Sequence, residues 1–183
     1  MSNIRIFVSH RIDIDSETVD TPVYFPVRCG AVYDEEGNSE IQGDDTGDNI
    51  SKLRMSFCEF TVQYWAWKNV DADYYGLCHY RRYLSFSDKR YKNTAFNMVR
   101  ELRLTAHEKK KYHLDDTKKI NIVVQKYDMI IPELAKASEM SYNRAEVKTL
   151  REMWESYNGV YFEQGIIDKM FSCLLYTSPS PRD

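Results

Sequence analysis

Tyr74-Tyr75-Gly76-Leu77-Cys78-His79-Tyr80-Arg81-Arg82-Tyr83 is the stretch of the chain that decides the fold. Its first six residues, Tyr74 to His79, have the composition of a short buried β-strand, and a histidine, two arginines and two tyrosines stand at its end. In an open α/β sheet, ligands bind just beyond the carboxyl ends of the strands. Two guanidinium groups and an imidazole at such a position predict an anion-binding site, and the arginine fork matches phosphate oxygens best.

The composition is that of a globular chain with a sizeable core. The chain has 183 residues, 43% hydrophobic and 29% charged, and this length fits one domain. Its net charge of -3 argues against a bulk nucleic-acid-binding protein, which is usually basic. The spacing of its four cysteines fits neither a zinc ribbon nor a redox motif, so we expect free thiols and a cytoplasmic protein. No apolar run approaches about 20 residues, and we expect no transmembrane segment.

Three further stretches have the composition of β-strands. Ile4–His10 is predicted as the first strand, because it is rich in β-branched and aromatic residues. Val23–Val27 is predicted as an extended segment that Pro26 restricts to an edge or irregular strand. Tyr127–Ile131, which Pro132 follows, is predicted as another strand.

The longest predicted helix runs from about Ile50 to Lys68. Two apolar stripes follow it: Leu53, Phe57, Phe60, Tyr64 and Trp67 in one, and Met55, Cys58, Val62 and Trp65 in the other. A helix that is apolar on two faces is usually buried, so we expect these aromatic side chains in the core rather than in a stacking platform. Further helix is predicted, in broken form, over 93–119, and again over 133–157.

The loop before the long helix is a second candidate site. It reads Asp44-Asp45-Thr46-Gly47-Asp48-Asn49-Ile50-Ser51. Backbone N–H groups at a helix start favour anions, Gly47 would let a ligand approach closely, and Asn49 and Ser51 could bond a ribose or a sugar. Two alternatives stay open: the aspartates could bind a divalent metal through oxygen ligands, or Asp48, Asn49 or Ser51 could merely cap the helix.

Two smaller motifs also contain residues of the kind that bind metals or nucleotides. Asp71-Ala72-Asp73 spells the Asp-x-Asp pattern with which many sugar-nucleotide enzymes hold a metal, but it precedes the Tyr74–His79 strand and is predicted as a turn. His10 and Arg11 end the first strand, at the same edge of the sheet as His79. His10 is therefore a candidate nucleotide-binding residue, with a hydrogen-bonded structural histidine as the alternative. The chain contains neither a G-x-S-x-G motif nor a P-loop.

The end of the chain, Ser172–Asp183, has neither a helical nor a strand period. It resembles the translated read-through of a sequencing adapter, and we expect the native chain to have continued beyond Phe171. We therefore expect one domain over 1–171, incomplete at its C-terminus, and a disordered tail over 172–183.

The block from Thr46 to Tyr83 resembles a known family. The resemblance is carried by Thr46–Ser51, Cys58–Thr61, Tyr64–Asn69 and Asp73–Tyr83, and also by the opening strand with His10, by Pro26–Gly30 and by Tyr127–Pro132. These residues are similar to an uncharacterised-domain family found among bacterial capsular and exopolysaccharide glycosyltransferases. The resemblance spans most of residues 1–135.

The resemblance implies an α/β fold of the GT-A type, a Rossmann-like sandwich around a central, mostly parallel sheet. It implies a hexosyltransferase-type enzyme that moves a sugar from a nucleotide sugar, with a UDP-sugar as the expected donor. The expected acceptor is a glycan or lipid-linked glycan that grows into capsular polysaccharide, exopolysaccharide or lipopolysaccharide. No nucleic acid is expected as a partner, and peripheral contact with the inner face of the membrane is compatible with this activity.

Roles for individual residues follow from the resemblance. His79, Arg81 and Arg82 would hold the donor diphosphate and assist its departure. The nucleotide or the donor sugar would be held by His10, Asp48, Asn49 and Ser51. The three cationic residues stand near the usual place of the Asp-x-Asp motif and could neutralise the diphosphate themselves, so a need for Mn²⁺ or Mg²⁺ stays open. No residue is assigned as general base.

Two other classes of protein remain as alternatives. A metal-dependent phosphoesterase would use Asp44, Asp45, Asp48 and His79. A non-catalytic nucleotide-binding or glycan-binding module would use the same anion site without transfer.

Overall fold

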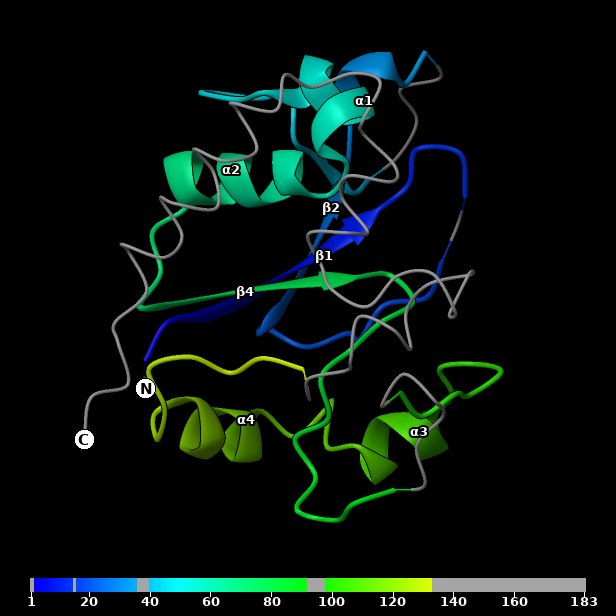
Figure 1. Ribbon diagram of the computed structural model, residues 1–183, viewed down its shortest axis with the longest axis vertical. Helices are drawn as coiled ribbons and strands as arrows, with labels where there is room; N and C mark the ends of the chain where they lie inside the picture. Colours follow the sequence, from blue (N-terminus) through cyan, green and yellow to red (C-terminus); the bar gives the residue numbers. More distant parts are fainter. Residues whose placement is uncertain (1, 15, 36–39, 92–97, 133–183) are drawn as a thin grey trace, which may run out of the picture. The chain divides into compact units, whose positions relative to one another are not determined.

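The sheet of this protein is parallel throughout (Figure 1). A computed structural model describes residues 2–14, 16–35, 40–91 and 98–132. Among them, the strands are β1 (Ile4–His10), β2 (Tyr24–Arg28), β3 (Gln42–Gly43) and β4 (Tyr74–His79), in the order β3-β2-β1-β4. This arrangement confirms the predicted α/β class with a central parallel sheet. The helix predicted over 133–157 and the tail over 172–183 lie outside the described residues.

Helices cover both faces of the sheet (Figure 1). On one face, α2 (Phe60–Asn69) packs Val62, Trp65 and Ala66 against Phe7 and Val27 of the strands. Phe7, Val27 and Val62 are almost completely buried, and such burial contributes about 1.5–3 kcal/mol for each side chain. The sheet is therefore held on this side by a small aromatic and aliphatic core.

The other face carries α3 (Ala106–Lys111) and α4 (Thr117–Val124). Ile120 of α4 is fully buried and belongs to one cluster with Val8 of β1 and Tyr80, which follows β4. α3 lies within the region 93–119 that is predicted as broken helix, whereas α4 begins near its end and continues to Val124; Thr105 and Asp116 cap the two helices. The short apolar run at the end of α4 is helical rather than extended.

β2 is a central strand, so the prediction of an edge or irregular strand is wrong. The backbone groups of odd-numbered residues face β1: the carbonyl of Val23 accepts from the N–H of Ile6, and the N–H of Cys29 donates to the carbonyl of His10. Pro26 is even-numbered, so its nitrogen points to the other side of the strand, away from β1. On that side β3 pairs only with residues 27 and 28. Proline is tolerated here because no neighbouring strand needs its missing N–H.

The single helix predicted from Ile50 to Lys68 is also wrong. The structure has a 3₁₀ turn, η2 (Ser51–Leu53), then α1 (Arg54–Phe57), and a break at Cys58 before α2 begins. Cys58 has φ 47° and ψ -129°, and its carbonyl accepts from the Cys29 thiol (3.2 Å) and from the backbone N–H of Thr61 (3.2 Å). These two bonds replace the bond to the fourth residue along the chain that the carbonyl would accept in a continuous α-helix.

The break changes which apolar side chains are buried. Val62 and Trp65 lie in the core as expected, at 0% and 4% exposure. Most of the other members of the two stripes are exposed, among them Met55 at 87% and Trp67 at 64%. The expectation that both stripes are buried is therefore wrong, because only one face of α2 contacts the sheet.

Two strand predictions have different outcomes. β4 has the predicted bounds, but it is half-buried rather than buried, because it pairs only with β1 among the described residues. Tyr127–Ile131 is not a strand, and Tyr127, Met129 and Ile131 are exposed. Its alternating pattern is not sufficient, because a strand requires a hydrogen-bonded neighbour and the segment pairs with none of the described strands.

Candidate functional site

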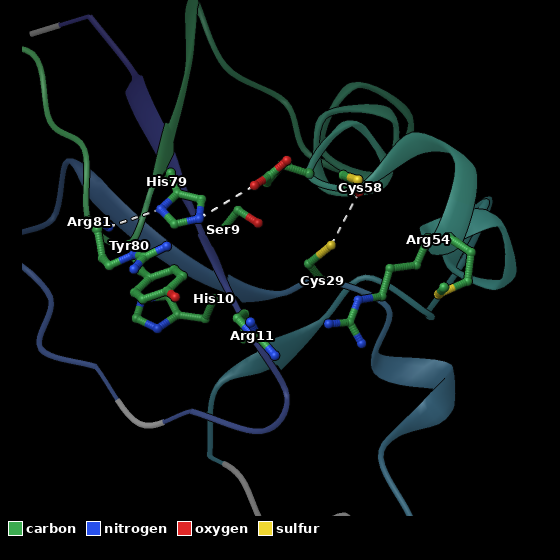
Figure 2. A pocket seen from close by; sticks show the side chains of 11 residues that line it. Ser9, His10, Arg11, Cys29, Arg54, Cys58, His79, Tyr80 and Arg81 are labelled. Atoms are coloured by element: carbon green, nitrogen blue, oxygen red, sulfur yellow. Dashed lines mark hydrogen bonds and ion pairs between the residues drawn. The ribbon is translucent and has the colours of Figure 1, made fainter. Parts of the chain in front are cut away.

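A cavity of about 310 Å³ opens at the carboxyl ends of β1, β2 and β4, beside α1 (Figure 2). Its walls come from the strand ends, from the loops that follow them and from the helical segment around the break. They are formed by Ser9, His10, Arg11, Cys29, Arg54, Met55, Cys58, Glu59, His79, Tyr80 and Arg81. The anion site predicted beyond β4 therefore coincides with a real hollow that contains three arginines.

The alternation of side chains along the strands positions the first wall. Phe7 of β1 and Tyr75 of β4 stack on the α2 side of the sheet. Every second side chain of a strand points to the same face, so Ser9, two residues after Phe7, and His79, four residues after Tyr75, also face the α2 side. This is the side from which the start of α2 approaches.

His79 is held at both ring nitrogens. The backbone N–H of Arg81 donates to Nδ1 at 3.2 Å, so the proton of a neutral ring lies on Nε2, which is 3.4 Å from the Glu59 carboxylate. Burial lowers the pKa of His79, the Glu59 carboxylate opposes this shift, and the nearby arginines lower the pKa further. At pH 7 His79 is therefore a neutral hydrogen-bond donor, and the positive charge of the cavity comes from the arginines.

Tyr80 connects the charged side chains. Its ring stacks on His79 with the centroids 4.2 Å apart, and the Arg81 guanidinium carbon lies 5.0 Å from the centroid of the same ring. The ring of His10 lies 6.2 Å from it, in a tilted arrangement. Tyr80 itself is buried, and its fixed ring orients the Arg81 guanidinium and the His79 imidazole.

His10 lines the cavity but is almost completely buried, at 2% exposure. Its Nδ1 lies 2.8 Å from the Ser16 hydroxyl, and its Nε2 has no hydrogen-bond partner among the described residues. Burial and the neighbouring His79 lower its pKa, so the ring is neutral at pH 7. The unused nitrogen keeps a ligand-binding role for His10 as a prediction.

Arg82 differs from Arg81 in its position. The chain turns after β4, the N–H of Arg82 donates to the carbonyl of His79, and the Arg82 side chain is not among those that line the cavity. Arg82 is close enough to lower the pKa of His79. The structure thus brings His79 and Arg81 together at the cavity, whereas a ligand role for Arg82 stays a prediction.

The predicted loop residues Asp48, Asn49 and Ser51 do not line the cavity. Asp48 accepts a hydrogen bond from the Tyr64 hydroxyl, and Asn49 bonds to backbone groups of its own loop and accepts from the N–H of Ser51. Ser51 is fully buried and donates to Asp44 at 2.6 Å. These contacts are structural, and a ligand role for the three residues stays a prediction.

Gly47 shows why this loop needs a glycine. Its φ is 58°, and a Cβ at this position would lie 2.0 Å from the side-chain oxygen of Asn69. The Asn69 side chain accepts from the N–H of Asp48 and donates to its carbonyl. The close neighbour of Gly47 is therefore α2 of the same chain, at the place where the sequence suggested a ligand.

Two metal-binding alternatives find little support in the geometry. Asp73 of the Asp-x-Asp run accepts from the N–H of Asn3 at the amino ends of β1 and β4, at the edge opposite the cavity. Asp44 is buried and already accepts four hydrogen bonds. Within the described part of the chain, no group of three or more histidine, cysteine, aspartate or glutamate side chains could hold a metal ion.

Sequence reasoning missed two charged residues of the cavity. Arg54 extends into it from α1, and Glu59 contributes the one carboxylate among the described residues that line it. Both belong to the segment that the sequence predicts as a continuous helix, where a charged residue is usually a solvated one. The break at Cys58 turns this segment toward the strand ends, and no local pattern marks it.

The family described as a domain of unknown function, DUF4422, matches residues 5–164. The chain belongs to the DUF4422 family. No curated protein matches the chain.

A solved structure with the same fold is that of the WbbM bifunctional glycosyltransferase, in its apo form. The two chains share 28% sequence identity with a TM-score of 0.68, over 87% of the present chain. The match spans 29% of the WbbM chain, so the present chain corresponds to less than a third of that protein. Of the described helices, none is long and apolar enough to cross a membrane.

Proposed function

We propose that this protein is a glycosyltransferase that moves a sugar from a nucleotide sugar to a glycan acceptor. The observation that carries the proposal is the arginine-lined cavity at the carboxyl ends of three parallel strands, in a fold shared with a glycosyltransferase. This edge is where open α/β sheets bind nucleotides, and guanidinium groups match the oxygens of a diphosphate.

The proposed chemistry uses the charges of the cavity in the transition state. The bond between the anomeric carbon and the diphosphate oxygen breaks, and the electron pair leaves with the diphosphate. A bond forms from the anomeric carbon to the acceptor oxygen, whose proton is released. Arg81 and the Nε2–H of His79 would stabilise the charge that develops on the leaving oxygen, which is the largest electrostatic task of such a step.

The donor is proposed to be a UDP-sugar, bound without an obligatory metal. Support comes from the cationic residues of the cavity and from the position of the Asp-x-Asp run at the other edge of the sheet. A capsular, exopolysaccharide or lipopolysaccharide acceptor on the cytoplasmic side of the membrane is the acceptor class that the family resemblance favours.

Titration of the full chain with UDP, in EDTA and then in Mn²⁺, tests the proposal. We expect binding in EDTA, and we expect Arg81→Ala to weaken it about tenfold or more, because it removes a charge-assisted hydrogen bond. Arg90→Ala removes an exposed arginine that does not line the cavity and should leave the affinity unchanged. Equal affinity of the Arg81→Ala variant and the unmodified chain would contradict the proposal.

The release of UDP from a panel of UDP-sugars separates the enzyme from a binding module. We expect the unmodified chain to release UDP, and the Arg81→Ala variant to release it at least tenfold more slowly at saturating donor. Binding without release from any donor, with glycan acceptors present, would favour the non-catalytic module.

A further inference from the structure

Arg54 brings a positive charge to the wall of the cavity from α1. Its side chain lines the cavity, and it has no hydrogen bond or ion pair with any described residue. The other cavity arginines are engaged, since Arg11 pairs with Asp13 and Arg81 lies over the ring of Tyr80. The charge of Arg54 acts on the Asp13 carboxylate only through space, where it helps to lower the pKa of that group. A half-buried guanidinium with no hydrogen-bonded partner among the described residues, at the wall of a hollow, can bind an anion.

The position of the Arg54 side chain is set by Gly30. A Cβ on Gly30 would lie 2.1 Å from Cδ of Arg54 and 2.9 Å from its Cγ, so the methylene groups of Arg54 cross directly over the glycine. Gly30 has φ 71°, a conformation that favours glycine. Because the stem of Arg54 is packed, less side-chain entropy is lost when its guanidinium binds a ligand.

A buried carboxylate holds the backbone that carries Arg54. Asp44 accepts from the N–H groups of Gly30 and Ala31, each at 2.9 Å, and from the hydroxyls of Ser51 and Thr61, each at 2.6 Å. Ser51 precedes α1 and Thr61 follows the break after it. Asp44 thus ties both ends of the α1 segment to the glycine on which the Arg54 side chain rests.

Figure 2 shows the Arg54 side chain reaching from α1 toward Cys29 and Arg11, across the cavity from His79 and Arg81. We propose that Arg54 binds the diphosphate of the donor from the α1 side, while Arg81 and His79 bind it from the β4 side. The assignment rests on the proposed function and adds a residue to its anion site. A diphosphate carries charge on two phosphoryl groups, and cationic walls on two sides of one hollow match that distribution.

Titrations of the full-length chain with UDP, inorganic pyrophosphate and uridine, in EDTA, test this assignment. Arg54→Ala should weaken the binding of UDP and pyrophosphate about ten- to a hundredfold and leave uridine binding unchanged. The affinities of Arg54→Lys for UDP and pyrophosphate should lie between those of the unmodified chain and of Arg54→Ala, because lysine keeps the charge but lacks the planar pair of donors of arginine. Lys52→Ala is the matched control: it removes the same charge two residues away, from an exposed side chain outside the cavity, and should change each affinity less than twofold.

The outcomes separate this assignment from the proposed function. Binding of UDP to the unmodified chain with no loss in Arg54→Ala would overturn the assignment and leave the proposed function standing. No binding of UDP or pyrophosphate to the unmodified chain would overturn both. A loss of uridine affinity equal to that of UDP, or a lowered melting temperature of Arg54→Ala, would show a structural role instead.

Discussion

Glu59 and His79 form the pair that distinguishes this cavity from a simple cluster of arginines. The Glu59 carboxylate lies 3.4 Å from Nε2 of His79 and opposes the lowering of its pKa by burial and by the arginines. The same carboxylate repels an incoming diphosphate. At the scale of single residues, the protonation of His79 therefore depends on which charge stands next to it.

Glu59→Gln should lower the pKa of His79 further, because it removes the neighbouring negative charge that raises this pKa, while burial and the arginines remain. NMR titration of the imidazole resonances measures this change directly. Glu40→Gln removes an exposed carboxylate that does not line the cavity, and it should leave the His79 titration unchanged. A His79 pKa that rises in the Glu59→Gln variant would contradict the assigned contact.

The segment from η2 to α2 is the element that determines the shape of the cavity. Its break at Cys58 depends on bonds to Cys29, and its two ends depend on Asp44. Neither partner is near in sequence, so a pattern of apolar residues predicts one helix where the structure has two. The same separation explains why Arg54 and Glu59 were not predicted as site residues.

Asp44→Ala should destabilise the fold by about 3–5 kcal/mol, because it leaves two buried N–H groups and two hydroxyls without their acceptor. Unfolding in urea, followed by circular dichroism, measures the loss. Asp45→Ala, which changes the adjacent exposed aspartate, should cost less than about 1 kcal/mol. Equal stability of the two variants would contradict the role of Asp44 as an anchor.

At the scale of the whole molecule, parallel strands bring distant parts of the chain to one edge. β1, β2 and β4 all end at the cavity, although residues 10, 28 and 79 are far apart in sequence. This convergence buries His10 and half-buries His79, and burial lowers the pKa of both rings. The stability of the fold is thereby linked to pH.

Stability should fall as the pH drops below about 6.5, the ordinary pKa of histidine. In that range the unfolded chain binds protons at both histidines while the folded chain, with lowered pKa values, binds fewer, so protons favour unfolding. Urea unfolding between pH 7.5 and pH 5.5 measures the dependence. His10→Asn should reduce it, whereas His107→Asn, at an exposed site, should not. A stability that rises toward pH 5.5 would contradict this reasoning.

The sequence by itself determined the strands that carry the site and the residues at their ends. The bounds of Ile4–His10 and Tyr74–His79 agree with the structure, because strand composition and period are local properties. The position of His79 and Arg81 beside a cavity followed from the general rule for parallel sheets. The family resemblance was carried by the same residues and by the block that precedes them.

Only the tertiary structure decided which side chains share the cavity. Asp44 and Ser51, candidates from their loop, serve the fold, while Arg54 and Glu59 reach the hollow from a helix that is broken by contacts with Cys29 and Asp44. Tyr127–Ile131 has a strand pattern but no strand beside it among the described residues. In each case the deciding interaction is a tertiary contact or the lack of one, such as the bond between Cys29 and Cys58, and the periodicity of the local sequence carries no signal of it.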